Sequence, residues 1–123
     1  MGKLLIMTTA IIGNCKTIDV SSLQRLIQIH APETDTILVG SVNKLAKTAE
    51  DMATAYGYAL EKELPDFEND GKLATRFRDS RIVRRSDFIL SVGESFSTTI
   101  QHTLRIAKDR GKRYHAIQRY KNV

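Results

Sequence analysis

Cysteine, proline and tryptophan are scarce or missing in this sequence of 123 residues. It has one cysteine, Cys15, two prolines and no tryptophan. A single cysteine excludes an intrachain disulfide and leaves a zinc site without its usual supply of ligands. No apolar run approaches the roughly 20 residues that cross a bilayer. We therefore expect no disulfide framework, no contact with a membrane, and no metal or other cofactor.

The first residues, 1–7, lack the features of a secretory signal. Their apolar run is too short for a hydrophobic signal region, and no small-residue cleavage site follows it. We interpret this run as the start of a strand and expect a cytoplasmic protein. Cys15 then lies near the end of that strand, where we interpret it as an inert small residue because no nearby histidine is indicated.

Charge is unevenly distributed along a chain of otherwise ordinary composition. Apolar residues make up 41% and charged residues 27%, as in soluble globular proteins, and the length suits a single domain over 1–123. Residues 1–71 contain 6 Lys/Arg and 10 Asp/Glu, whereas residues 72–123 contain 13 and 4. The C-terminal part, with a basic tail at 118–123, is a candidate surface for an anionic ligand or nucleic acid; solvated basic helices are the alternative.

Short segments typical of strands alternate with helical patterns along the chain. Strands are predicted over 4–12, 36–40, 58–64, 88–92 and 114–117, and helices over about 21–30, 44–56, 73–85 and 97–110. Five strands that alternate with helices require right-handed crossovers and hence a parallel sheet. We predict a doubly wound, three-layer α/β/α domain whose five-stranded parallel sheet has the order 3-2-1-4-5.

Helical spacing and turn chemistry make finer predictions. The helix over 44–56 is predicted to bury Leu45, Ala49, Met52 and Tyr56 and to end at Gly57. The Arg-rich helix over 73–85 is predicted to bury Phe77 and Ile82, with Leu73 beside them. Ser21 or Ser22 is expected to cap the first helix. Residues 65–71 are expected to form an acidic loop.

Three strand-to-helix turns are predicted to meet at one rim of the sheet. They are residues 13–17, 40–44 and 93–99. Ligands of open α/β sheets bind at the carboxyl ends of the strands, where helix N-termini gather and can accept an anion. Ser97, Thr98 and Thr99 then offer hydroxyl and backbone donors to a phosphate, although such a triplet is more commonly a simple helix cap. Asn14 and Asn43 are candidates for contacts with a sugar or base.

The segments 87–90, 97–104 and 107–112, with the order and spacing of the turns, resemble the SLOG superfamily of Rossmann-like domains, in particular its small YspA-like members. These domains bind nucleotides or nucleotide-derived ligands, and their relatives include the DNA-processing protein DprA and the LOG phosphoribohydrolases. By this resemblance Gly13 and Asn14 match the first turn and Gly40 the first glycine of the second loop. Arg78 and Asp79 match an Arg-Asn pair, and Ser97 matches the serine of the last loop.

The sequence departs from the family pattern at glycine positions. Ser41 and Lys44 replace glycines of the second loop, Ala46 replaces its aspartate, and Thr99 and Ile100 replace the Gly-Thr of the last loop. Glycines let backbone N–H groups approach a phosphate closely, so these changes alter or remove the nucleotide pocket. The ligand site that we predict comprises Gly13, Asn14, Gly40, Ser41, Asn43, Lys44, Arg78, Asp79, Glu94, Ser97, Thr98 and Thr99.

Four functions remain open from the sequence. The first is binding of a nucleotide-like small molecule at the rim. The second is hydrolysis of an N-glycosidic or phosphate bond by Glu94, Asp79 and His102, although no residue is assigned as catalytic. The third is DprA-like nucleic-acid binding through Arg78, Arg81 and Arg85. The fourth is a protein-inhibitor role on a degenerate scaffold. Because members of the family often self-associate, we also expect a homo-oligomer.

Overall fold

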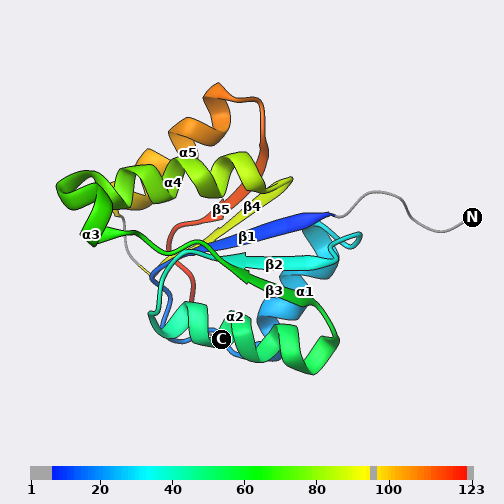
Figure 1. Cartoon of the computed structure of the whole chain (residues 1–123). Helices are drawn as coiled ribbons and strands as arrows, with labels where there is room; N and C mark the ends of the chain where they lie inside the picture. The colour runs from blue at the N-terminus through cyan, green and yellow to red at the C-terminus, as the bar shows by residue number, and fades with distance from the viewer. Residues whose placement is uncertain (1–6, 95–96, 122–123) are drawn as a thin grey trace, which may run out of the picture.

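A five-stranded parallel sheet forms the centre of the protein (Figure 1). The computed structural model describes residues 7–94 and 97–121, apart from the side chain of Thr99. The strands have the order β3-β2-β1-β4-β5. Their bounds are Thr8–Gly13 (β1), Thr36–Val39 (β2), Ala59–Lys62 (β3), Phe88–Val92 (β4) and Arg113–Ile117 (β5). The predicted fold class and strand order are confirmed; the part of the first predicted strand over 4–6 lies outside the described residues.

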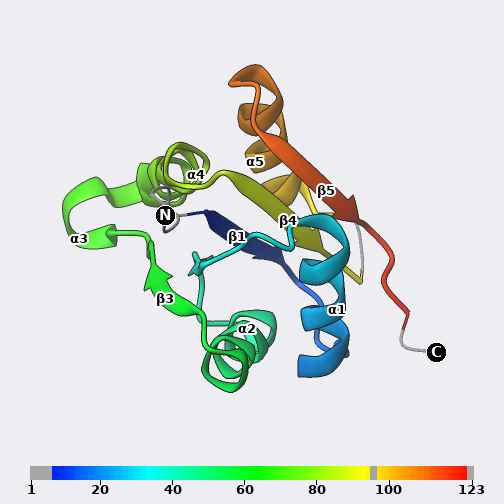
Figure 2. The ribbon, with the colours of Figure 1, turned by 90° about the vertical axis from the view of Figure 1, so that its right-hand side faces the viewer.

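Helices cover both faces of the sheet (Figures 1 and 2). One face carries α1 (Val20–His30) and α2 (Lys44–Tyr56), and the other carries α4 (Ala74–Arg85) and α5 (Thr98–Asp109). A short helix α3 (Phe67–Asp70) and a 3-10 turn η1 (Gly71–Leu73) precede α4. The interpretation of 65–71 as an acidic loop was therefore wrong for its second half, where the Asp66 side chain caps α3 by accepting from Asn69 N at 3.1 Å.

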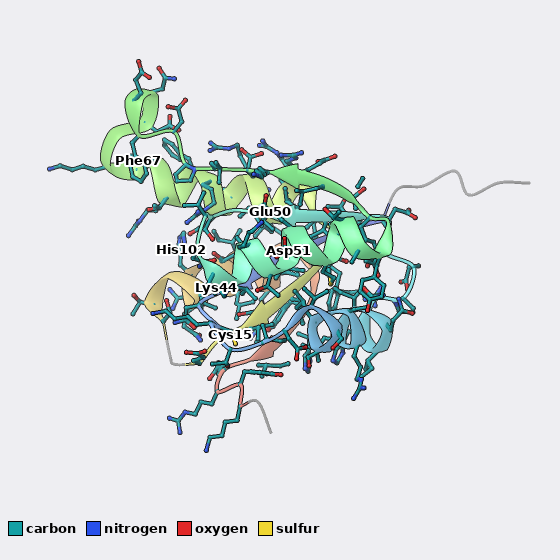
Figure 3. All side chains as sticks on the ribbon, turned by 90° about the horizontal axis from the view of Figure 1, so that it is seen from below. Cys15, Lys44, Glu50, Asp51, Phe67 and His102 are labelled. Atoms are coloured by element: carbon teal, nitrogen blue, oxygen red, sulfur yellow. The ribbon has the colours of Figure 1, made fainter. Side chains whose placement is uncertain are left out.

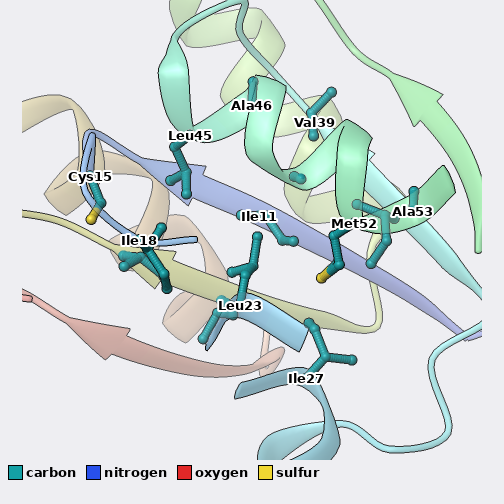
Figure 4. Packing of buried hydrophobic residues seen from close by; sticks show 14 of the residues in the cluster. Ile11, Cys15, Ile18, Leu23, Ile27, Val39, Leu45, Ala46, Met52 and Ala53 are labelled. Carbon is teal, nitrogen blue, oxygen red and sulfur yellow. The ribbon is translucent and has the colours of Figure 1, made fainter. Parts of the chain in front are cut away.

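Two hydrophobic clusters hold the three layers together. Along the central strands neighbouring residues alternate between the two faces. Ile11 and Leu90 pack under α1 and α2, whereas Ala10 and Ile89 pack under α4 and α5. Figure 4 shows side chains of the first cluster between β1, α1 and α2. Full burial of each such Leu or Ile contributes about 1.5–3 kcal/mol, so the sheet is anchored from both sides.

Side chains cap the N-termini of α1, α2, α3 and α5. Asp19 caps α1 by accepting a hydrogen bond from Ser22 N at 2.8 Å, so the prediction of Ser21 or Ser22 as the cap was wrong. The Asp19 carboxylate can accept this bond from outside the helix, while the two serines already lie in the first turn. At the other end of α2, Gly57 adopts the left-handed conformation (φ 79°), as its predicted role as a helix stop requires.

Three apolar side chains predicted to face the core are partly exposed instead. Tyr56, Leu73 and Phe77 expose 49%, 49% and 44% of their surface. Tyr56 is the last residue of α2, next to Gly57, where the helix ends before the chain enters β3. On α4 the buried stripe includes the charged residue Asp79 because Arg78 pairs with it, and Phe77 is thereby rotated toward solvent.

Candidate functional site

Three loops meet at the carboxyl ends of the strands, as predicted. Asn14 accepts a hydrogen bond from Glu94 N at 3.1 Å, and Asn14 N donates to Val92 O at 3.2 Å. Asn43 Nδ2 donates to Gly13 O at 2.9 Å. The loop after β1 is therefore bonded to the loops after β2 and β4, and the three form one continuous rim.

The rim surrounds a cavity of about 230 Å³, which we call the rim cavity. It lies where the strand order reverses, because the chain leaves β1 toward α1 on one face and leaves β4 toward α5 on the other. Such a switch point opens a crevice between the diverging loops. Its lining residues are Ile12, Gly13, Asn14, Ser41, Asn43, Arg78, Ser97, Ile100 and Thr103.

Two helix N-termini reach the rim cavity. Asn43 caps α2 by accepting from Ala46 N at 2.9 Å, and Ser97 caps α5 by accepting from Ile100 N at 3.5 Å. The N-terminal turn of a helix carries a partial positive charge and backbone N–H groups that lack a partner within the helix. The amide of Asn43 bonds through both its oxygen and its nitrogen, so this residue holds the rim together. Its contact with a sugar or base stays a prediction.

Arg78 is the cation of the rim cavity. Its side chain is 12% exposed, with Nε at 2.7 Å from Asp79 Oδ1 and Nη1 donating to Gly40 O. Asp79, whose side chain is 5% exposed, also lies 3.3 Å from His102 Nδ1 through its second oxygen. Bonds on two sides hold the guanidinium in a fixed orientation toward the cavity, which is the pre-organisation that charge-assisted anion binding needs.

Two of the predicted glycines are needed by the protein itself. A Cβ on Gly13, which has φ 134°, would lie 2.0 Å from Val92 O, so this glycine permits the close approach of β1 and β4. A Cβ on Gly40 would lie 2.3 Å from Ile82 Cδ1 and 3.1 Å from Arg78 Cδ. Gly40 is thus required for α4 to pack against the end of β2, and it lies behind Arg78 rather than in the rim cavity.

The other predicted ligand residues lie around the rim cavity rather than in it. Lys44 is exposed at the start of α2, and Figure 3 shows it at the same end of the molecule as His102. Thr98 and Asp79 line a neighbouring cavity between α4 and α5, together with Thr75, Arg76 and His102. The side chain of Thr99 lies outside the described residues.

Glu94 has a structural partner. Its Oε1 accepts from Lys16 N at 2.7 Å and lies 3.8 Å from Cys15 Sγ. The bond from the Lys16 backbone, with smaller contributions from Thr17, holds the pKa of Glu94 below its ordinary value. Glu94 is therefore an ionised carboxylate that holds the loop after β1 by accepting a backbone hydrogen bond. A carboxylate with a lowered pKa is poorly suited to donate a proton as a general acid.

Sequence reasoning missed three residues of the rim cavity. Ile12, Ile100 and Thr103 line it, and Thr103 is only 3% exposed. Ile100 and Thr103 are three residues apart and share one side of α5. That spacing is visible in the sequence, but Ile100 was interpreted as a departure from the Gly-Thr of the last loop.

The arginines proposed for nucleic acid are paired with acids of the same chain. Arg81 Nε lies 2.6 Å from Glu63 Oε1, and Arg85 pairs with Glu61 and Glu63. The hydrogen bonds from Arg85 and Arg81 lower the pKa of Glu63 despite its partial burial, which opposes them. The structure therefore gives no support to a nucleic-acid interface through Arg78, Arg81 and Arg85.

Comparison with family models, with curated proteins and with solved structures finds no match for this chain. Within residues 7–94 and 97–121 no group of three His, Cys, Asp or Glu side chains is arranged to hold a metal ion. No helix in the described ranges is long and apolar enough to cross a membrane. The rim cavity is the place where the predicted site residues come together.

Proposed function

We propose that the protein binds a nucleotide or nucleotide-derived ligand in the rim cavity. The observation that carries this proposal is the convergence of Arg78 with the N-termini of α2 and α5 at the switch point between β1 and β4. An anion there receives backbone N–H groups, two helix dipoles and a fixed guanidinium. The resemblance to the SLOG superfamily gives the same ligand class, and a signalling or sensing role is part of this proposal.

The volume of the rim cavity limits how much of a nucleotide it can hold. At about 230 Å³ it is smaller than the roughly 300–1,000 Å³ of pockets that enclose a whole drug-sized ligand. We assign it to the phosphate and the sugar. Ser97 and Arg78 contact the phosphate in this arrangement, and Ser41, on the opposite loop, contacts the sugar.

Calorimetric titration of the wild-type protein with nucleoside monophosphates, cyclic nucleotides and ADP-ribose tests the proposal. Arg78→Gln should weaken binding about 10- to 100-fold, because a hydrogen bond to a charged group contributes about 1.5–3 kcal/mol and each 1.4 kcal/mol is about tenfold. Arg84→Gln is the matched control, since Arg84 is exposed on the same helix. Circular dichroism must show that both variants are folded.

Absence of heat with every nucleotide would contradict the proposal. Equal affinity of the wild type and a folded Arg78→Gln variant would remove Arg78 from the site. Weaker nucleotide binding by the Arg78→Gln variant, with the affinity of Arg84→Gln unchanged, supports the proposal.

The hydrolase alternative retains part of its predicted machinery. Glu94 is bonded to the loop after β1, so only the Asp79–His102 pair, beside the rim cavity, remains for proton transfer. Incubation with nucleoside monophosphates and chromatographic detection of free base separates hydrolysis from binding.

Nucleic-acid binding is a second candidate, at a different surface from the one predicted. Residues 98–121 contain seven Lys/Arg and one acid, a net charge of +6, while the remaining residues together have a net charge of −1. A groove of about 320 Å³ between α5 and β5 is lined by Arg105, Lys108 and the 40% exposed Tyr114. Cations beside an exposed aromatic ring suit a single-stranded nucleic acid, and anisotropy titration with a labelled oligonucleotide tests this.

The homo-oligomer, the cytoplasmic location and the inhibitor role stay predictions. They rest on the family resemblance and on composition. Light scattering coupled to size-exclusion chromatography tests the first of them.

A further inference from the structure

A second cavity adjoins the rim cavity on the side of β2 and β3. It has a volume of about 300 Å³ and is lined by Gly40, Ser41, Val42, Leu64, Pro65 and Arg78. Ser41 and Arg78 line both cavities, so the two lie next to each other. We call this second one the apolar cavity, because Val42, Leu64 and Pro65 provide its walls.

The walls of the apolar cavity are exposed although they are hydrophobic. Val42 is 82% exposed in the loop after β2, and Leu64 is 40% exposed in the loop after β3. The backbone around them is held by hydrogen bonds from Glu63 N to Val39 O at 2.8 Å and from Arg81 Nη2 to Leu64 O at 3.5 Å. The backbone that carries these exposed apolar side chains is thus hydrogen-bonded at Val39 and Leu64, beside a polar cavity.

Arg78 separates the two cavities. Among the described residues its Nε bonds Asp79 and its Nη1 bonds Gly40 O, so the guanidinium plane has a defined orientation at their junction. Gly40 makes this arrangement possible, because a Cβ there would collide with Ile82 and press on Arg78. Guanidinium planes stack on aromatic rings as well as binding anions with their N–H groups.

We propose that the apolar cavity binds the nucleobase of the ligand whose phosphate occupies the rim cavity. This inference rests on the proposed function and extends it. A ligand that fills both cavities is anionic at one end and apolar at the other, and the ring at its apolar end lies between Val42 and Leu64 next to the Arg78 guanidinium. Ser41, shared by both cavities, lies at the sugar between the two ends. The ligand class is a nucleoside monophosphate or a larger molecule that contains one.

Comparison of ribose 5-phosphate with AMP, GMP, CMP and UMP tests this inference by calorimetry. At least one nucleotide should bind the wild type about tenfold more tightly than ribose 5-phosphate, which lacks the base. Val42→Ser combined with Leu64→Ser should abolish this gain and leave the affinity for ribose 5-phosphate within about twofold. Both substitutions are neutral, so they leave the electrostatic attraction for the phosphate unchanged.

Ile29→Ser is the control, because Ile29 is 63% exposed on α1 and lines neither cavity. Ribose 5-phosphate binding without any gain from a base overturns the base site and leaves the proposed function intact. If the Val42/Leu64 double variant loses affinity equally for ribose 5-phosphate and for the nucleotide, the base site is also overturned. The two side chains would then affect binding of the phosphate and not of the base. No binding of either ligand to the wild type overturns the proposed function as well.

Discussion

Gly13 shows how one residue can serve the fold at the point where a ligand is expected. Its φ of 134° lies in a region that favours glycine, and the position of its missing Cβ is 2.0 Å from Val92 O. A family resemblance alone assigns such a glycine to the ligand. The geometry instead assigns Gly13 to the contact between β1 and β4, at which the rim cavity lies.

Gly13→Ala should therefore lower the free energy of unfolding by at least about 2 kcal/mol, since backbone strain costs roughly 1–3 kcal/mol and overpacking about 1–3 more. Gly57→Ala is a suitable control, because Gly57 also has positive φ but no heavy atom within 4 Å of its added Cβ. It should cost about 1–2 kcal/mol, the price of the left-handed conformation alone. Urea unfolding measures both, and equal losses would refute the collision.

Residue types alone could not reveal the partners of the arginines. Arg81 and Arg85 pair with Glu63 and Glu61, which lie 18 to 24 positions earlier and reach α4 only because β3 is the edge strand beside it. Helical periodicity reports neighbours three or four positions apart, so it predicted a free basic face. Phe77 was wrongly predicted to be buried because the pattern counts only apolar residues, whereas α4 buries Asp79 through its bonds to Arg78 and His102.

The elements themselves were predictable because their signals are local. Short runs rich in large apolar residues, such as 36–39 and 88–92, are typical of strands covered on both faces, and the structure buries every residue of both. The number of strands and helices then fixed the parallel sheet and where its loops meet. The apolar cavity was not predictable, because it depends on how far α4 and the loop after β3 approach β2.

The end of α1 contacts the edge strand β5 through a pair of histidines. The rings of His30 and His115 stack with centroids 3.9 Å apart. Arg113 donates to His30 O at 3.4 Å and lies 3.6 Å from Glu33. Burial first, and repulsion from His115 second, lower the pKa of His30 below 6.5. The folded protein therefore binds a proton at His30 less readily than the unfolded chain does.

The stability of the protein should fall as the pH drops through 6.5 toward the lower pKa of folded His30. The contribution is fully present above the unfolded pKa, because both states are then neutral, and it is lost on acidification because the unfolded state takes up more protons. Thermal unfolding between about pH 7.5 and 5.5 avoids most carboxylate titration. His30→Gln should flatten the dependence in this range, and an unchanged slope would exclude His30 as its origin.

Over the whole molecule, net charge is confined to one side of the sheet. Residues 98–121 account for +6, and the rest of the chain is close to neutral. The ion pairs of α4 with β3 neutralise the opposite edge. Long-range attraction of a polyanion is thereby directed to the α5–β5 groove rather than to the Arg-rich helix.

If this groove binds single-stranded nucleic acid, the affinity should fall as the salt concentration rises. The double variant Arg105→Glu with Lys108→Glu loses two phosphate contacts. It should therefore reduce the slope of log K against log salt by about 1.4, which is about 0.7 for each contact. Arg25→Glu with Lys47→Glu makes the same change of charge on α1 and α2 and should leave the slope unchanged. Anisotropy titrations at several salt concentrations measure both. Identical slopes in the two variants would show that net charge, and not the groove, governs binding.

The cations on α5, at the start of β5 and in the tail that follows also bear on contacts between copies of this protein. β5 is an edge strand whose outer hydrogen-bonding groups could pair with the same strand of another copy. Such a meeting brings two +6 surfaces together, and their repulsion disfavours end-to-end growth of the sheet. Salt screens this repulsion, so pairing of copies through β5 should become easier as the ionic strength rises.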